Sequence, residues 1–400
     1  MPMHDYLDEP RLLADIGGTN ARFALEMPSG EISHVRTLAT IDFPRFEDAA
    51  LSYLTQLTYL NTDPNLDPQL GQQLGQKLDQ KARLIIKHAV IAIANPVGQD
   101  AIKMTNHHWA FSVNSARAEL GLQTLLMVND FSALAMAVPS LAPHELQQIG
   151  GGSAKPDAVI GILGAGTGLG VGMLVPELGG WRSLQSEGGH VAFAPSDERE
   201  ITVLRYCWEK YEHVSTERLA SGPGIGLIHA ALAAAAGRIV DHTLTTEMIV
   251  SRALNGDAIC LETVECFCGM LGTFAANLAV TLFTQGGIYI GGGVVPRLGH
   301  FFARSSFRSR FEKKGRFSDF TAQIPTYVIT AQQPAFIGAA ALLNQHLQKN
   351  QQTSSQISSQ IAPKKNETYV KLRGLSVAPK TVHLHGEAST ITSSPVFRKS

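Results

Sequence analysis

The sequence contains little cysteine and no strong excess of charge. Four cysteines occur in 400 residues, and 33 Lys and Arg nearly balance 34 Asp and Glu, which gives a formal net charge of -1. This balance excludes a basic nucleic-acid-binding surface over the whole chain. The C-x-C pair of Cys266 and Cys268 has no second Cys or His cluster at metal-ligand spacing. We therefore expect buried, reduced thiols rather than a zinc site.

Long apolar runs and a secretion signal are also missing. No stretch of about 18 uninterrupted apolar residues occurs, which is the length that a membrane-spanning helix needs. The N-terminal MPMHDYLDEP carries acidic residues where a signal peptide has a basic start and an apolar core. These absences predict a cytoplasmic protein without membrane contact.

Several common nucleotide and metal motifs are absent. There is no G-x-x-x-x-G-K-[ST], which excludes a Walker-type NTPase, and no H-E-x-x-H. GAGTGLGVG contains alternating glycines but does not have the G-x-G-x-x-G spacing, so a dinucleotide-binding fold is poorly supported.

The composition that is present predicts a large α/β protein. A chain of 400 residues with 44% hydrophobic content can bury a large core and favours two domains with a cleft. Runs typical of strands alternate with helical ones, for example TLLMVND before FSALAMAVP. The Gln-rich interval 61–82 is typical of an exposed insertion.

The C-terminal segment differs from the rest in charge and composition. From residue 349 on, eight Lys and Arg accompany two Glu, whereas the first 348 residues contain 25 basic and 32 acidic side chains. Its Ser, Thr, Gln and Lys cannot bury enough apolar surface to offset the entropy of ordering. Residues 349–400 are therefore predicted to be a largely disordered, basic extension.

Two segments share one plan. LLADIGGTNARFALEM (12–27) and VIGILGAGTGLGVGMLV (159–175) each consist of an apolar strand, a turn of Gly and Thr, and a second apolar strand. Turns with few Cβ atoms allow backbone N–H groups to approach an anion, although glycine marks any tight hairpin. Two such hairpins favour a duplicated phosphate-binding fold. GGIYIGGGVVPRL (286–298) adds a strand that runs into glycines before a helix start.

Two short polar motifs interrupt apolar sequence. VND places Asp130 at the end of a strand, where a carboxylate can face a cleft and accept a proton; Asn129 and Asp130 could instead cap the helix that follows. SEGGH (186–190) puts Glu187 and His190 around a glycine pair after strand-like sequence. Such side chains are often solvated or structural, so the residues alone leave both interpretations open.

Taken in order, seven motifs resemble the bacterial glucokinases of the proteobacterial type, in the actin/hexokinase/Hsp70 superfamily. They are LLADIGGTNARFAL, MTNHHWAFS, VNDFSALAMAVP, GAGTGLGVGML, EGGHVAFAP, SGPG and GGIYIGGGVVPR. The resemblance covers residues from about 12 to about 347. It implies a two-domain, actin-like (ribonuclease H-like) α/β fold with a deep cleft. The smaller domain would comprise 1–140 plus 333–348, and the larger one 141–332.

The resemblance also implies roles for individual residues. Asp130 would be the general base, and Asp15 would hold Mg²⁺ directly or through one of its waters. The residues implied to contact the sugar are Asn106, Asn129, Asp130, Glu187, His190 and Glu217. The residues implied to contact ATP are Asp15, Gly17, Gly18, Thr19, Asn20, Gly166, Thr167, Gly168, Gly291, Gly292 and Gly293, with Arg22 just beyond the first turn. Asn106 could equally belong to a packed loop.

The resulting hypothesis is an ATP-dependent glucokinase, a homodimer by resemblance, that binds no nucleic acid. Three alternatives remain at this stage: a kinase of another hexose on the same fold, a sugar-responsive regulator of transcription, and a catalytically silent sugar-binding protein. Only 11 residues precede the first phosphate strand, too few for a helix-turn-helix. The EGGHVAFAPSDERE segment lacks the Cys-rich zinc motif of many related sugar kinases.

Overall fold

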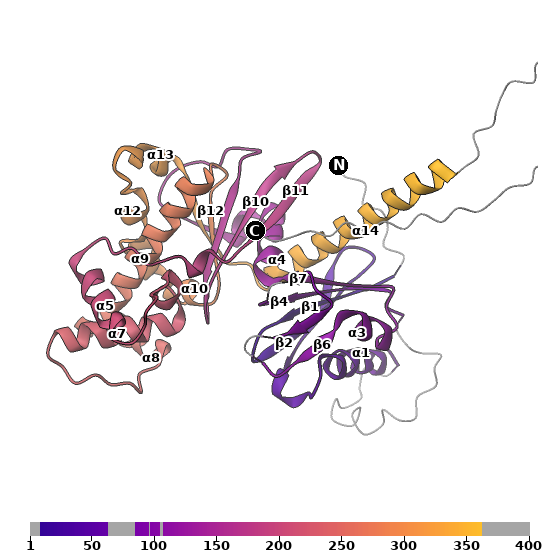
Figure 1. Cartoon of the computed structure of the whole chain (residues 1–400), viewed down its shortest axis with the longest axis horizontal. Coiled ribbons are helices and arrows are strands. Elements are labelled where there is room, and N and C mark those ends of the chain that lie inside the picture. The colour runs from indigo at the N-terminus through magenta and orange to yellow at the C-terminus, as the bar shows by residue number, and fades with distance from the viewer. Residues whose placement is uncertain (1–8, 63–84, 96, 105–106, 362–400) are drawn as a thin grey trace, which may run out of the picture. The chain divides into compact units, whose positions relative to one another are not determined.

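The computed structural model describes residues 9–62, 85–95, 97–104 and 107–361. The chain divides into a compact unit, Met1–Asn350, and a second unit, Gln351–Ser400. The described part of the second unit is the end of helix α14 (Pro334–Ile361). All sheets belong to the first unit (Figure 1).

The first sheet has five strands in the order β3-β2-β1-β4-β7. β1 pairs antiparallel with β2 and parallel with β4, and β4 pairs parallel with β7. Helices α1 and α3 follow strands β3 and β6 in the chain, and β5 and β6 form a separate ribbon. The bounds are β1 Arg11–Ile16, β2 Asn20–Glu26, β3 Ile32–Ala39, α1 Phe46–Thr62, β4 His88–Ile93, β5 Ala101–Lys103, β6 Ala110–Ser112, α3 Val113–Glu119 and β7 Thr124–Asn129.

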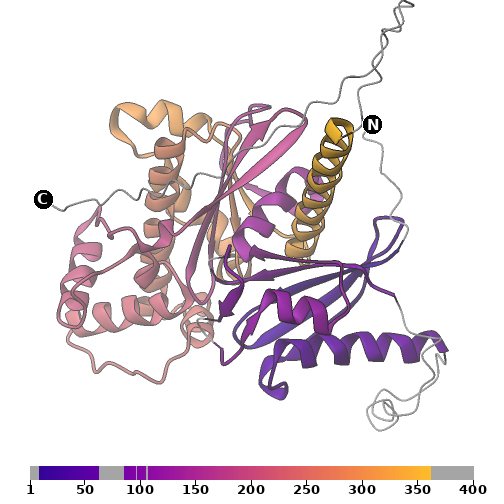
Figure 2. The same ribbon diagram turned by 45° about the vertical axis from the view of Figure 1, so that its right-hand side comes forward.

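The second sheet has six strands in the order β11-β10-β9-β12-β13-β8. Its strands are β8 Leu146–Ile149, β9 Ile160–Ala165, β10 Leu169–Glu177, β11 Gly180–Ser186, β12 Ile288–Gly291 and β13 Thr326–Ile329. Most helices of this part gather on one side of the sheet (Figure 2). They are α5 Glu198–Trp208, α6 Thr216–Leu219, α7 Gly222–Ala235, α8 Thr246–Leu254, α9 Ala258–Leu282, α10 Val294–Leu298, α11 His300–Arg304, α12 Phe307–Glu312 and α13 Ser318–Gln323.

Helices α4 (Asp130–Ala137) and α14 contribute to the cores of both sheets. Ala133 of α4 and Phe336 of α14 pack in a cluster with strands of the first sheet. Leu134 and Met136 of α4 pack in another cluster with strands of the second sheet. The two helices approach each other at backbone distance, because a Cβ on Gly338 would lie 1.6 Å from the carbonyl oxygen of Ala133. Helix α4 is thereby fixed from several sides.

The predicted hairpins are confirmed, since β1–β2 and β9–β10 are antiparallel pairs. All four cysteines are free and buried, as predicted. By length and composition α9 could cross a membrane, but 72% of its most apolar stretch is buried in the protein, so it serves as a core helix. Helix α14 continues to Ile361, beyond residue 348 where the sequence predicts its end and beyond the predicted start of disorder.

Other predictions about chain organisation stay predictions. The insertion expected at 61–82 lies outside the described residues except for the last turn of α1. Residues 362–400 of the expected extension also lie outside them. The division into domains 1–140 plus 333–348 and 141–332 likewise stays a prediction.

Candidate active site

Asp130 stands where the last strand of the first sheet becomes a helix. β7 ends at Asn129, and Asp130 is the first residue of α4. The Asn129 side-chain oxygen accepts hydrogen bonds from the backbone N–H groups of Phe131 (3.0 Å) and Ser132 (3.1 Å). Asp130 Oδ1 accepts from the N–H of Phe131, at 2.8 Å. Asn129 therefore supplies the helix cap, which leaves Asp130 Oδ2 without a hydrogen bond to the described residues.

The surroundings of Asp130 raise its affinity for a proton. Burial is the main cause and raises the pKa of this carboxyl to about 6. The negative charges of Asp15 and Glu187 raise it further, against the hydrogen bond from Phe131. Asp15 belongs to the first sheet and Glu187 follows strand β11 of the second, so charges from two segments far apart in the sequence act on the Asp130 carboxyl. A carboxyl whose pKa lies near 6 is suited to accept a proton at neutral pH.

The first glycine turn connects β1 to β2 and is braced from outside. The Gly17 N–H donates to the Asn20 carbonyl at 3.0 Å and closes the turn. Thr40, which is 1% exposed, donates its hydroxyl to the carbonyl of Gly18 at 3.1 Å and its N–H to that of Thr19 at 3.0 Å. With these carbonyls engaged, the turn keeps one shape. Thr19 and Asn20 are exposed at its tip.

Asp15 lies on β1 directly before this turn. Arg22, its register partner on β2, donates to Asp15 Oδ2 at 3.0 Å. Burial raises the pKa of Asp15, and the Arg22 charge and hydrogen bond lower it in part. The remaining negative charge is strong enough to raise the pKa of Asp130.

The second glycine turn connects β9 to β10. The Gly166 N–H donates to the Gly168 carbonyl, and the N–H of Gly222, at the start of α7, donates to the Gly166 carbonyl, both at 2.8 Å. A Cβ on Gly168 would lie 2.5 Å from Glu217 Oε2, whereas one on Gly166 would meet nothing within 4 Å. Gly168 thus makes room for Glu217, and Gly166 stays open to a ligand.

Glu187, His190 and Glu217 form one polar group. His190 Nε2 lies 3.9 Å from Glu187 Oε2, and His190 Nδ1 lies 3.8 Å from Glu217 Oε1. Glu217 Oε2 accepts from the N–H of Leu169 at 2.9 Å, which ties this group to the second turn. The two side chains of the SEGGH motif are exposed, at 69% for Glu187 and 60% for His190. They are solvated side chains, and with Glu217 they present carboxylates and an imidazole to any ligand beside them.

The third glycine segment follows β12 as predicted and precedes α10. Gly292 has φ +80°, and a Cβ there would lie 2.4 Å from the carbonyl oxygen of Ala165. A Cβ on Gly291 would lie 2.5 Å from Leu134 of α4. Gly293 has open space, so it alone of the three is free of packing demands.

One predicted site residue stays untested, and two residues that support the glycine turns received no role from the sequence. Asn106 lies outside the described residues. Thr40 is a support of the first turn that the sequence analysis missed, because its partners are 21 and 22 positions away and follow no local pattern. Gly222, within the SGPG motif, received no role from sequence although its N–H braces the second turn. Thr167, like Thr19, is exposed at a turn tip.

The donor set near Asp15 fits a magnesium ion. Mg²⁺ prefers oxygen ligands and commonly takes only one or two carboxylates, with water and substrate phosphates supplying the rest. Asp15 is such a carboxylate, and its charge adds to those of Asp130 and Glu187 in a region that a cation would neutralise. Within the described ranges no group of three or more His, Cys, Asp or Glu could enclose a metal, so any bound Mg²⁺ would take its other ligands from water or a substrate.

Comparison with known proteins agrees with this geometry. The family model described as Glucokinase matches residues 12–346, which include both glycine turns, Asp130 and the SEGGH motif. The chain belongs to the glucokinase family. Its fold is therefore the actin-like ATPase fold expected from the sequence.

Three relatives show how far the similarity extends. "Bifunctional protein glk" of Burkholderia thailandensis is 52% identical over 342 residues, which cover 86% of this chain and 50% of that protein. "Glucokinase" of Chromobacterium violaceum is 49% identical over 339 residues, covering 84% and 90%. The crystal structure of a glucokinase from an Antarctic psychrotroph superposes with a TM-score of 0.71 at 33% identity, covering 85% and 100%. The chain thus spans about half the length of its bifunctional relatives.

Proposed function

We propose that this protein is an ATP-dependent glucokinase that converts D-glucose to glucose 6-phosphate. The observation that carries the proposal is the position of Asp130, whose pKa is raised by burial and by the charges of Asp15 and Glu187. The carboxylate of Asp15 on β1 and that of Glu187 in the SEGGH motif thus both act on Asp130. Family membership supports the same assignment.

The chemistry follows from these positions. Asp130 accepts the proton of the sugar 6-hydroxyl as its oxygen bonds to the γ-phosphorus of ATP, and the bond from that phosphorus to the β-γ bridging oxygen breaks. ADP leaves with the bridging oxygen, and Asp130 later returns the proton to solvent. Because positioning dominates phosphoryl transfer, the cap at Asn129 and the packing of α4 contribute by holding Asp130 still.

The glycine turns are proposed to hold ATP. Backbone N–H groups of Gly18, Thr19 and Thr167, with the exposed Thr hydroxyls, can donate to phosphate oxygens. Gly293 would let the adenosine approach the backbone. Mg²⁺, held at Asp15 directly or through water, would neutralise phosphate charge when bound.

The sugar is assigned to the polar group after the second sheet. Glu187 and Glu217 can each accept from sugar hydroxyls, while neutral His190 can donate from one ring nitrogen and accept at the other. Asn129 and Asn106 are proposed to add contacts from the first half of the chain. A site of this kind rejects analogues that leave its polar groups unpaired, so it should prefer glucose over galactose and fructose.

A coupled assay of the purified full chain with Mg-ATP and a panel of hexoses tests the proposal. Glucose should give the highest kcat/KM. Preference for mannose, fructose or an N-acyl hexosamine would replace the assignment by another sugar kinase of the same fold. Glucose binding without turnover of any hexose would favour the non-catalytic regulator.

Cellular and assembly properties belong to the same proposal. A cytoplasmic location would give access to ATP and glucose and agrees with four reduced, buried cysteines. A homodimer and a place in glycolysis come from family resemblance. Light scattering of the purified chain tests the oligomeric state.

A further inference from the structure

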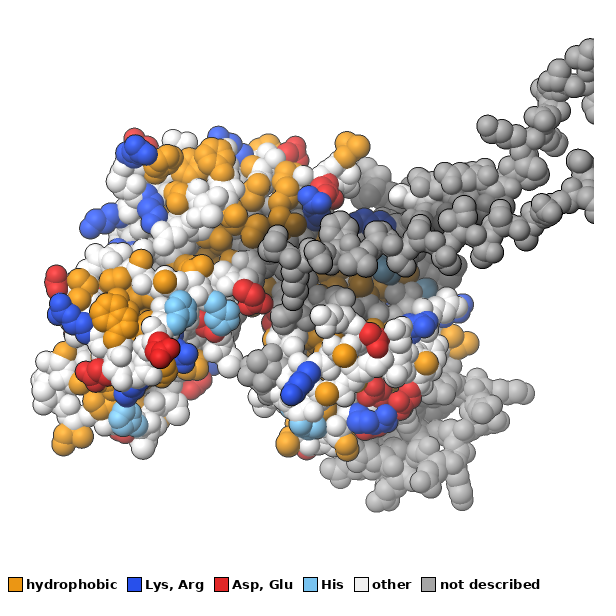
Figure 3. Space-filling view, in the orientation of Figure 1, with side chains coloured by type: hydrophobic (Ala, Val, Ile, Leu, Met, Phe, Trp, Pro, Cys, Tyr) orange, Lys and Arg blue, Asp and Glu red, His pale blue; other side chains and the backbone are white. Residues whose placement is uncertain are grey.

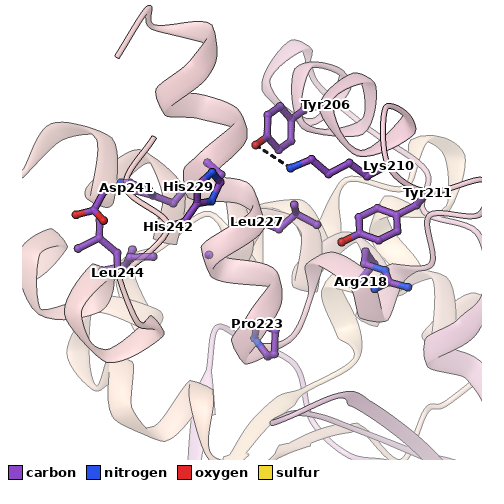
Figure 4. Close-up of a pocket in the computed structure, with 13 residues that line it drawn as sticks. Tyr206, Lys210, Tyr211, Arg218, Pro223, Leu227, His229, Asp241, His242 and Leu244 are labelled. Atoms are coloured by element: carbon purple, nitrogen blue, oxygen red, sulfur yellow. Dashed lines mark hydrogen bonds between the residues drawn. The ribbon is translucent and has the colours of Figure 1, made fainter. Parts of the chain in front are cut away.

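A pocket of about 330 Å³ lies among helices α5 to α8, which pack beside the second sheet. Its lining includes none of the proposed catalytic or substrate-binding residues. Tyr206, Lys210, Tyr211 and Arg218 lie on one side of helix α7, and the segment 241–244 lies on the other (Figure 4). Leu227, Leu244 and Ile249 add apolar surface. This volume suits a small molecule.

Two cations of this pocket have no carboxylate partner among the residues that the structure describes. Neither Lys210 nor Arg218 takes part in an ion pair with another described residue. Lys210 Nζ donates to the Tyr206 hydroxyl at 3.3 Å, and the Arg218 guanidinium stacks 4.2 Å from the centre of the Tyr211 ring. Stacking fixes the guanidinium plane while leaving its N–H edge available for an anion.

The charges of Lys210 and Arg218 both act on the thiol of Cys207. Burial raises the pKa of the Cys207 thiol to about 11, and the positive charges of Arg218 and Lys210 both oppose that rise. The lining contains one acidic residue, Asp241, whose Oδ1 accepts from the N–H (2.9 Å) and hydroxyl (2.6 Å) of Thr243. Asp241 lies in the segment 241–244 on the other side of helix α7, so the side of the lining with Lys210 and Arg218 contains no acidic residue (Figure 4).

A buried histidine supplies a further polar atom. His229 lines the pocket and is 8% exposed, yet its ring makes no hydrogen bond to another described residue. Its ring nitrogens are not fully buried, so they can donate to or accept from a ligand in the pocket. On the surface, the region of helices α5, α7 and α8 mixes apolar side chains with basic, acidic and His side chains (Figure 3).

We infer that this pocket binds a small phosphate monoester, with Lys210 and Arg218 on the phosphoryl group and the carbon portion against Leu227. A phosphate monoester carries nearly two negative charges at neutral pH, which matches two unpaired cations better than a single carboxylate does. The apolar surface explains why an ester, rather than free phosphate, is the better fit. The inference does not depend on the proposed kinase activity.

Titration calorimetry of the full chain with phenyl phosphate tests this site, with glucose and a non-hydrolysable ATP analogue present to occupy the proposed active site. Lys210→Gln and Arg218→Gln should each weaken binding about 10- to 100-fold, because each loses a charge-assisted hydrogen bond. Lys155→Gln, at an exposed lysine outside the pocket, should bind as the parent does. Lys210 and Arg218 are exposed, so the variants should melt at the parent temperature.

Absence of binding by the parent at millimolar phenyl phosphate would overturn the inference, as would equal affinity in the parent and in both pocket variants. Inorganic phosphate should bind at least tenfold more weakly than phenyl phosphate, and equal affinity would refute the assignment to a monoester. Heat of binding requires no turnover. Failure of the hexose assay would therefore leave this result intact, and the reverse also holds.

Discussion

The two sheets share the same hairpin arrangement but carry different residues at the equivalent register position near the glycine turn. In each, a strand pairs antiparallel with the next strand and parallel with a later one, and a glycine turn of three residues closes the hairpin. Before the first turn the register pair is Asp15 and Arg22; before the second it is Gly164 and Gly170. The first repeat carries charge where the second carries no side chain.

In the second sheet, the ring of Phe131 occupies the space that side chains on Gly164 and Gly170 would need. A Cβ on Gly170 would lie 1.8 Å from this ring, and one on Gly164 would lie 3.0 Å from it. Phe131 follows Asp130, so the glycine pair of one repeat anchors the proposed base that follows the other. At these equivalent register positions the first repeat thus carries a carboxylate, whereas the second leaves room for the Phe131 ring.

The largest expected effect comes from removing charge in the first repeat. Asp130→Ala should lower kcat by about 10²- to 10⁴-fold, the usual contribution of a general base. Helix α4 should persist because Asn129 supplies its cap. Steady-state kinetics with a thermal melt checks both points. Turnover near the parent rate would show that another group takes the proton.

The next effect comes from adding a side chain to the second repeat. Gly170→Ala should displace the Phe131 ring and with it the first turn of α4, so kcat should fall about 10²-fold, as expected when a catalytic group moves by about 1 Å. Overpacking should also destabilise the fold by about 1–3 kcal/mol. Urea denaturation and the coupled assay measure the two. An unchanged rate would mean that Phe131 does not position Asp130.

Within the second turn, Gly168→Ala should affect the sugar more than the nucleotide. Its Cβ would push Glu217 from the N–H of Leu169, so the KM for glucose should rise about tenfold while that for ATP changes little. Gly166→Ala is the matched control, since it has open space and faces the proposed phosphate site. If both variants change only the KM for ATP, the link between this turn and Glu217 has no functional role.

The pH dependence should report the carboxylates of the first repeat. Asp130 can accept a proton only when ionised, and its pKa is about 6. Activity is therefore retained above that pH and lost as pH falls through it, with kcat/KM near one tenth of its plateau at about pH 5. A pH profile measures this, and the residual activity of Asp130→Asn should lack the same limb. An inflection near 4 would indicate an unburied base.

The smallest effect is expected at the C-terminus. Ending the chain after Asn350 keeps the whole first compact unit and removes residues of low apolar content. Activity should stay within about twofold of the parent and the melting temperature within about 1–2 °C, since such surface changes are usually near neutral. A large drop in melting temperature would mean that this segment packs on the first compact unit.

Local sequence patterns predicted the fold well, but they predicted poorly the contacts between segments that lie far apart in the sequence. Apolar strands around Gly and Thr marked both hairpins, and VND marked the strand-to-helix junction. The division of labour between Asn129 and Asp130 could not be predicted, because both residue types can cap a helix. Nor could the support from Thr40 or the seat of Phe131 on Gly164 and Gly170, since these depend on how distant segments pack.

The shared position of helix α14 bears on the order in which the chain is completed during synthesis. Phe336, Ala339 and Leu343 of α14 finish a core whose other members include Leu13 on β1 and Val128 on β7. A ribosome makes those strands long before it makes α14, and chains generally fold from the N-terminus as they emerge. The first sheet is therefore synthesised early, but its core is completed only when α14 has been made. Until translation passes residue 343, its apolar face needs temporary cover, which makes the nascent chain a candidate client for chaperones.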